Sequence, residues 1–92
     1  GEYDLQMQRM QQGKRLQEVE RNNSMLVLYK TKGLRQAEEI IKASSLAYRS
    51  GEISFAELSQ FITQAIEIQK NYLDNLNTFN QSVIQYNYYI NQ

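Results

Sequence analysis

Apolar side chains recur in alternating steps of three and four residues between residues 55 and 90. This spacing is that of a coiled-coil seam, and it is maintained over about five heptads. Gln69 is the polar member of the row. The pattern predicts one helix over about 55–90, roughly 54 Å long at about 1.5 Å per residue. The row consists of Phe55, Leu58, Ile62, Ala65, Gln69, Tyr72, Leu76, Phe79, Val83, Tyr86 and Ile90.

A second apolar row lies beside the first and comprises Phe61, Ile66, Ile68, Leu73 and Ile84. One partner helix would cover the first row and leave much of the second exposed. So wide an apolar face is typical of a helix with neighbours on two sides. Such a helix belongs either to a larger bundle or to a ring of helices, and periodicity does not separate these two arrangements.

The first half of the chain is also predicted to be helical, over about 2–48, although its pattern is less regular. Leu34, Ala37, Ile41, Ser44 and Tyr48 keep the steps of three and four. Residues 3–21 are charged and rich in glutamine, and they favour helix by propensity. We expect 26–51 to pair antiparallel with 53 to about 78, and 79–92 to pair with about 10–25.

Two weak stretches interrupt this half. The run 22–24, Asn-Asn-Ser, has side chains that compete for the backbone, and 31–33 ends in a glycine that costs about 1 kcal/mol relative to alanine. We therefore expect a kink, bulge or short break of the first helix within 22–33.

The strongest turn signal is the run Tyr-Arg-Ser-Gly-Glu-Ile-Ser at 48–54. Gly51 suits the positive φ that a tight connection between helices requires. Ser54 and Glu57 have the spacing of a capping box, and Ile53 with Leu58 that of a hydrophobic staple. The predicted fold is all-α: a long antiparallel two-helix coiled-coil hairpin with its turn at 49–54. We expect residues 1–92 to be a single α-hairpin segment of a larger protein, since two helices enclose little core.

Composition narrows the possible partners. Ten basic and ten acidic residues give a net charge of zero, which argues against nucleic acid, a partner that requires a concentrated basic surface. The longest apolar run, 25–29, is far shorter than the roughly 20 residues of a membrane span. Proline is absent, so very long helices are permitted. After Lys70 the chain is rich in Asn and Gln. This composition either suits hydrogen bonding to other helices or a wet interior wall, or reflects compositional drift in an Asn-rich proteome.

The residues that usually carry chemistry are scarce. Cysteine and histidine are absent, which excludes disulfides and removes the two commonest soft metal ligands. The acidic residues are scattered, and two helices offer no cleft in which they could act together. Met7 and Met10 lie three residues apart and are read as packing residues rather than as a Cu(I) site. We expect no enzymatic activity, no catalytic residues, no cofactor and no metal site.

The amino-acid sequence of the turn and of the helices beside it resembles that of a known protein family. The matching stretches are 37–41 and 47–54, followed by 57–58, 64–65, 72–73, Leu76, 80–81 and positions near 86–89. Over about 26–90 the chain resembles the last periplasmic helical hairpin of TolC-type outer-membrane efflux factors. It is most similar to the branch that serves heavy-metal and cation pumps of the RND class, including Bacteroides-like forms fused behind the inner-membrane pump. Arg35 departs from this branch, which often has proline there, and the membrane β-strands of such factors lie outside 1–92.

The resemblance implies a conduit across the periplasm of a Gram-negative bacterium. In the parent, three protomers form a helical barrel whose hairpin tips meet a periplasmic adaptor protein and, through it, the inner-membrane pump. The docking surface would comprise Tyr48, Arg49, Gly51, Glu52 and Ser54. The alternative is the hairpin of a periplasmic adaptor itself, or another helical interaction scaffold. An adaptor hairpin would be flanked by lipoyl-like β segments, whereas an outer-membrane factor would have alternating membrane strands upstream.

Overall fold

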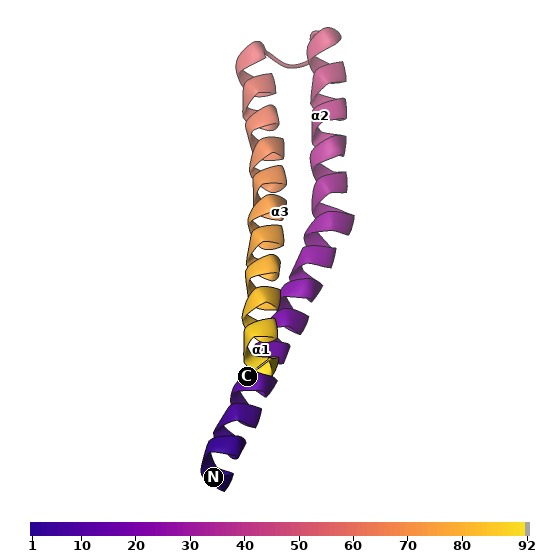
Figure 1. Cartoon of the computed structure of the whole chain (residues 1–92). Coiled ribbons are helices and arrows are strands. Elements are labelled where there is room, and N and C mark those ends of the chain that lie inside the picture. The colour runs from indigo at the N-terminus through magenta and orange to yellow at the C-terminus, as the bar shows by residue number, and fades with distance from the viewer. Residues whose placement is uncertain (92) are drawn as a thin grey trace.

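A computed structural model describes residues 1–91 as two antiparallel helical arms joined by one turn (Figure 1). The first arm consists of α1 (Glu2–Leu28), a π-helical segment η1 (Tyr29–Gly33) and α2 (Leu34–Arg49). The second arm is α3 (Phe55–Ile90). The molecule measures 73 × 17 × 15 Å. The predicted all-α hairpin is therefore confirmed, with the shape of a rod.

The first apolar row of α3 forms the seam against the first arm. Ala65 is fully buried and most of the row is half-buried, while Phe55, Gln69 and Ile90 at its ends and middle are exposed. The register follows from direct contacts: Gln12 Nε2 donates to the Tyr89 carbonyl at 3.2 Å, and a Cβ added at Gly33 would lie 3.5 Å from Ile68 Cγ2. This register agrees with the predicted antiparallel pairing.

Much of the second row of α3 is exposed, as expected. Ile66, Leu73 and Ile84 are 55%, 60% and 61% exposed, whereas Ile68 is half-buried. Since each residue turns a helix by about 100°, Ile66 and Leu73 lie on one side of the seam, and Phe61 and Ile68 on the other. The second row is thus two flanks, and apolar side chains border the seam on both sides.

The interruption predicted within 22–33 is confirmed and is narrowed to η1. The amide of Leu34 donates to the Tyr29 carbonyl five residues back, and the Thr31 hydroxyl donates to the Val27 carbonyl at 2.7 Å. The chain therefore bulges without breaking. The Asn-Asn-Ser run stays inside α1, where the Ser24 hydroxyl bonds back to the Glu20 carbonyl at 3.1 Å.

Most of the α1 side chains that are half-buried against the second arm are polar. Figure 1 shows α2 running beside α3, and α1 leaning across the far end of α3 with its N-terminal turns extending past that end. The apolar residues Leu5, Met7, Met10 and Leu16 are exposed. The half-buried positions of residues 1–24 are Gln8, Gln11, Gln12, Arg15, Glu18, Val19 and Asn22. Among residues 1–91, no helix combines the length and the apolar character needed to cross a membrane.

Candidate functional site

The backbone of the turn closes in a Schellman motif. Glu52 N–H donates to the Ala47 carbonyl at 2.9 Å, and Gly51 N–H donates to the Tyr48 carbonyl at 3.1 Å. Gly51 has φ of +82°, a left-handed conformation that side-chain-bearing residues rarely adopt. These bonds satisfy carbonyls that the end of α2 leaves without helical partners. The turn is therefore a defined structure with glycine at the position that requires it.

The start of α3 is fixed by a reciprocal cap. Ser54 Oγ accepts from Glu57 N–H at 3.1 Å, while the Glu57 carboxylate accepts from Ser54 N–H at 3.2 Å. Ser54 has extended backbone angles, as an N-cap residue should. Both side chains of the capping box are thus engaged within the turn itself.

An aromatic pair spans the two helix ends at the tip. The rings of Tyr48 and Phe55 meet edge to face with centroids 6.1 Å apart, close to the preferred geometry of such pairs. Tyr48 is 41% exposed and Phe55 is 67% exposed. Beside them, Leu46 is also exposed on α2. The tip therefore presents apolar and aromatic surface to solvent.

Opposite charges flank this aromatic pair. Arg49 is the last residue of α2, where a cation is favourable beside the helix carboxyl end, and its Nε donates to the Ser45 carbonyl at 3.4 Å. Glu52 follows Gly51 in the exposed turn. The ion pairs of residues 1–91 do not include Arg49 or Glu52. Both charged groups are accordingly accessible to a partner.

The five residues predicted to form a docking surface lie together at this tip. Two of them act within the turn: Gly51 supplies its backbone conformation and Ser54 caps α3. Tyr48, Arg49 and Glu52 present side chains outward. Phe55 belongs to the same surface, although periodicity assigned it to the seam. The sequence does contain a signal for its exposure, because Phe55 directly follows the N-cap and is therefore the first residue of α3, at the end of the hairpin.

An apolar groove with a volume of about 400 Å³ runs along one side of the hairpin below the tip. Ile40, Ala43 and Ala47 of α2 line one wall, and Phe61 of α3 lines the other. The remaining lining residues are Gln36, Glu39, Ser44 and Ile53. The groove is open and shallow, and no group of three or more His, Cys, Asp or Glu side chains that could hold a metal gathers anywhere in residues 1–91.

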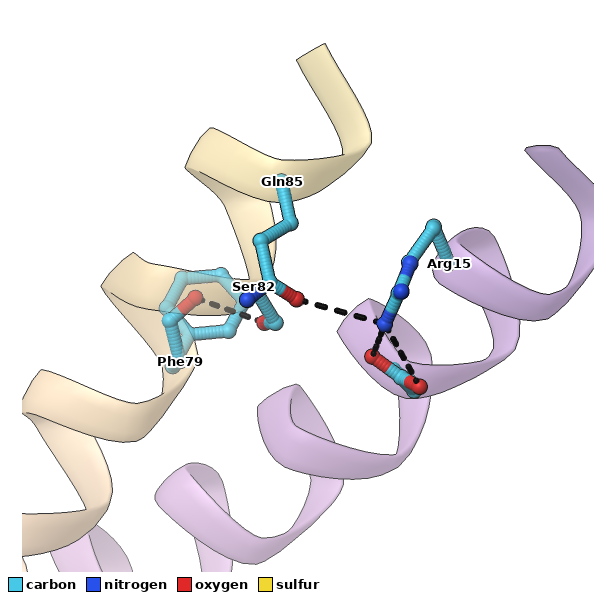
Figure 2. A network of polar contacts seen from close by, with 5 residues as sticks. Arg15, Phe79, Ser82 and Gln85 are labelled. Carbon is cyan, nitrogen blue, oxygen red and sulfur yellow. Dashed lines mark hydrogen bonds and ion pairs between the residues drawn. The ribbon is translucent and has the colours of Figure 1, made fainter. Parts of the chain in front are cut away.

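A polar cluster around Arg15 joins α1 to α3 near the other end of the molecule. Figure 2 shows Arg15 reaching toward Gln85, with an Nη1–Oε1 distance of 3.4 Å; Nη1 also lies 3.2 Å from Glu18 Oε2. The guanidinium carbon lies 5.1 Å from the centre of the Tyr89 ring, in cation–π range. Hydrogen bonding by Tyr89 and then by Glu18 raises the pKa of Arg15 above its ordinary value.

One turn before Gln85 on α3, the Ser82 hydroxyl donates to the Phe79 carbonyl of its own helix at 2.7 Å (Figure 2). Ser82 is buried, so this bond satisfies its hydroxyl without using α1. Arg15 Nε is buried and has no hydrogen-bond partner. The cluster is a structural contact between the two helices in which one buried donor, Arg15 Nε, remains unpaired.

Comparisons of the chain with protein families, with curated proteins and with solved structures find no match. The fold thus rests on the helices and their contacts, and the resemblance of the turn to efflux factors stays a prediction.

Proposed function

We propose that this hairpin is part of the wall of a periplasmic conduit: a tunnel-wall segment of the outer-membrane channel component in a tripartite RND-type efflux system. Its tip docks a periplasmic adaptor protein, and neighbouring helices cover its flanks. The segment acts by position and contact rather than by chemistry.

The observation that carries this proposal is the exposure of apolar side chains on both flanks of the α3 seam. A free-standing pair of helices would gain by covering such surface, because each Å² of apolar area removed from water contributes about 25 cal/mol. Ile66 and Leu73 on one flank, and the groove beside Phe61 on the other, remain open in the single hairpin. A helix placed between two neighbours in a wall covers both flanks.

The exposed side chains of the tip support the part of the proposal that concerns docking of an adaptor protein. Its backbone is closed on itself, so its exposed groups are Tyr48, Phe55, Arg49 and Glu52. Aromatic rings and arginine are the residue types that most often anchor protein interfaces. A surface of this size suits contact with another helical tip or a shallow socket.

The proposal that neighbouring helices cover the flanks of α3 is tested by measuring self-association. Sedimentation of the 92-residue chain should show species larger than a monomer, and Ile66→Lys with Leu73→Lys should shift them toward monomer. The matched control, Gln60→Lys with Asn71→Lys, adds the same charge at exposed polar positions of α3. A clean monomer at high concentration, or equal loss of association in the control variant, would contradict the proposal that this hairpin is a tunnel-wall segment.

Docking is tested in the full-length parent with a photoreactive side chain at Glu52 and, as the control, at the mid-helix position Lys70. Crosslinking from Glu52 alone to a protein with lipoyl-like halves supports the proposal. Crosslinking to an outer-membrane channel protein would instead make this chain the adaptor hairpin. Arg49→Ala with Glu52→Ala should lower resistance to the pump's substrates, whereas Glu67→Ala should not.

A further inference from the structure

The seam of α3 follows an unbroken seven-residue repeat. Leu58, Ala65, Tyr72, Phe79 and Tyr86 are each seven positions apart, and each is buried or half-buried. A strict heptad repeat of this kind keeps one face of a helix toward its partner over its whole length. The seven-residue spacing of contact positions in the second arm can therefore be compared directly with the spacing of contact positions in the first arm.

The first arm follows the same repeat in two separate phases. Gln8, Arg15, Asn22 and Tyr29 are seven apart and half-buried. Ala37 and Ser44 are again seven apart, and both are buried. Eight residues, rather than seven, separate Tyr29 from Ala37. In this row of contact positions, the first arm thus contains one residue more than its partner's repeat allows.

The additional residue between Tyr29 and Ala37 falls in the segment that contains η1. The bond from Leu34 N–H to the Tyr29 carbonyl spans five residues instead of four, which takes one extra residue into a single turn. In an uninterrupted α-helix, the surplus would rotate all of α2 by about 100° and carry Ala37 and Ser44 away from α3. With the π turn, the two faces stay aligned.

The position of the π turn is fixed by contacts on both of its sides. A Cβ added at Gly33 would lie 3.4 Å from Tyr29 Cδ1 and 3.5 Å from Ile68 Cγ2, so the chain passes close to α3 at this point. On the solvent side, the Thr31 hydroxyl donates to the Val27 carbonyl at 2.7 Å, supplying a donor within the turn where the helical ladder changes. Lys30 and Lys32 are exposed.

We propose that η1 is a phase adaptor: a one-residue insertion that the fold absorbs as a π turn so that α1 and α2 both face α3. It is a fixed part of the packing rather than a hinge. The single surplus residue is dispensable for packing, and its removal leaves a continuous α-helix in which Tyr29 and Ala37 lie one heptad apart. This inference stands independently of the conduit proposal, because it concerns the folding of the single hairpin.

Deletion of one residue tests the adaptor. Deleting Lys32 should leave the melting temperature unchanged or higher, because it removes the mismatch. Deleting Lys42, an equally exposed lysine between Ala37 and Ser44, changes the charge identically and creates a mismatch in the seam. The control should melt lower by about 5 °C or more at the same protein concentration.

Two further variants decide between an adaptor and a hinge. An alanine inserted after Lys32 adds a second surplus residue and should lower the melting temperature, as the Lys42 deletion does. Hydrogen exchange of the amides at 29–34 should slow when Lys32 is deleted. Equal destabilisation by the two deletions, an unfolded Lys32-deletion variant, or faster exchange at 29–34 would each overturn the proposal.

Discussion

The same helix, α3, meets two different partners along its length. Near the tip it packs against α2 through small residues: Ala37 and Ala65 are fully buried and Ser44 nearly so. Near the base it meets α1 through longer polar groups: Gln12 donates to the Tyr89 carbonyl, and the Arg15 guanidinium lies over the Tyr89 ring. The tip half is held by close approach of backbones, and the base half by hydrogen bonds and a cation–π contact.

The difference shows how one seam can serve two purposes. Small buried residues permit little adjustment, because interiors are packed as densely as organic crystals. Hydrogen bonds between long side chains tolerate movement, and each contributes only about 0.5–1.5 kcal/mol net. We therefore expect the tip half to be the more rigid part of the hairpin and the base half to adjust more readily to a neighbour.

We expect the largest loss of stability from a substitution that prevents the close approach of α2 and α3 near the tip. Ala65→Leu should lower stability by about 1–3 kcal/mol, since the register sets Ala65 opposite Ala37 and no space remains for a larger side chain. The matched change at the base, Ser82→Leu, should cost less, because α1 can lean away without a turn to hold it. Thermal unfolding followed by circular dichroism measures both, and a larger loss for Ser82→Leu would reverse the comparison.

The next effect acts on the backbone of the turn. Gly51→Val forces a β-branched residue into positive φ and should cost about 1–3 kcal/mol. In the base half, Gly13→Val provides the control, because a Cβ at Gly13 meets nothing within 4 Å and its backbone is helical. Denaturant unfolding should show a loss for the first variant and little change for the second. Equal stabilities would mean that the turn is not under conformational constraint.

Removal of the cap should have a smaller effect. Ser54→Ala leaves the Glu57 amide without its acceptor and should cost about 1 kcal/mol. Ser59→Ala, at an exposed position inside α3, should cost less or nothing. Chemical denaturation of the two variants side by side gives the difference in unfolding free energy. A similar cost at both positions would mean that the Ser54 cap does not specifically stabilise the tip.

The smallest expected effect is local and lies at the base. Arg15→Ala removes the contacts to Gln85 and Tyr89, so the amides of the last turns of α3 should exchange faster while global unfolding changes little. Arg9→Ala, at an exposed position, is the control. A global loss of stability in Arg15→Ala would show that the base half is not the adjustable part.

The pH dependence of this contact follows from the raised pKa of Arg15. A base whose pKa is raised on folding contributes stability that is fully present below its unfolded pKa and is lost as the pH rises through its folded pKa, which for an arginine lies far above neutrality. Exchange at the base should therefore be independent of the Arg15 charge between about pH 6 and pH 9. An Arg15-dependent change in protection within this range would contradict that assignment.

Local signals in the sequence were enough to predict the turn and the second helix. Gly51 with the Ser54–Glu57 pair specifies a helix end and a helix start, because each residue acts on backbone groups within a few positions. The seam of α3 could be predicted because its apolar row repeats over the whole helix. The five candidate docking residues lie close together because they occupy one turn of chain, and their docking role stays a prediction.

The contact face of α1 could not be predicted in the same way. Most of its half-buried side chains are polar, with Val19 and Leu26 as the apolar members, and Leu5, Met10 and Leu16 are exposed, so hydrophobic periodicity contains only a weak signal for it. The π turn was foreseen only as a weak region, because a surplus of one residue becomes visible when the buried positions of both arms are known. Phe55 was assigned to the seam because it continues the apolar row of α3, although its place directly after the N-cap puts it at the exposed end of the hairpin.

The Schellman motif and the capping box at the tip have a kinetic consequence for any partner. A connection of five residues that is already hydrogen-bonded at both ends has little conformational freedom left to lose on binding. Association would then be limited by orientation and diffusion rather than by ordering of a loop. Differences in affinity among variants of Arg49 or Glu52 should appear mainly as changes in the lifetime of the complex.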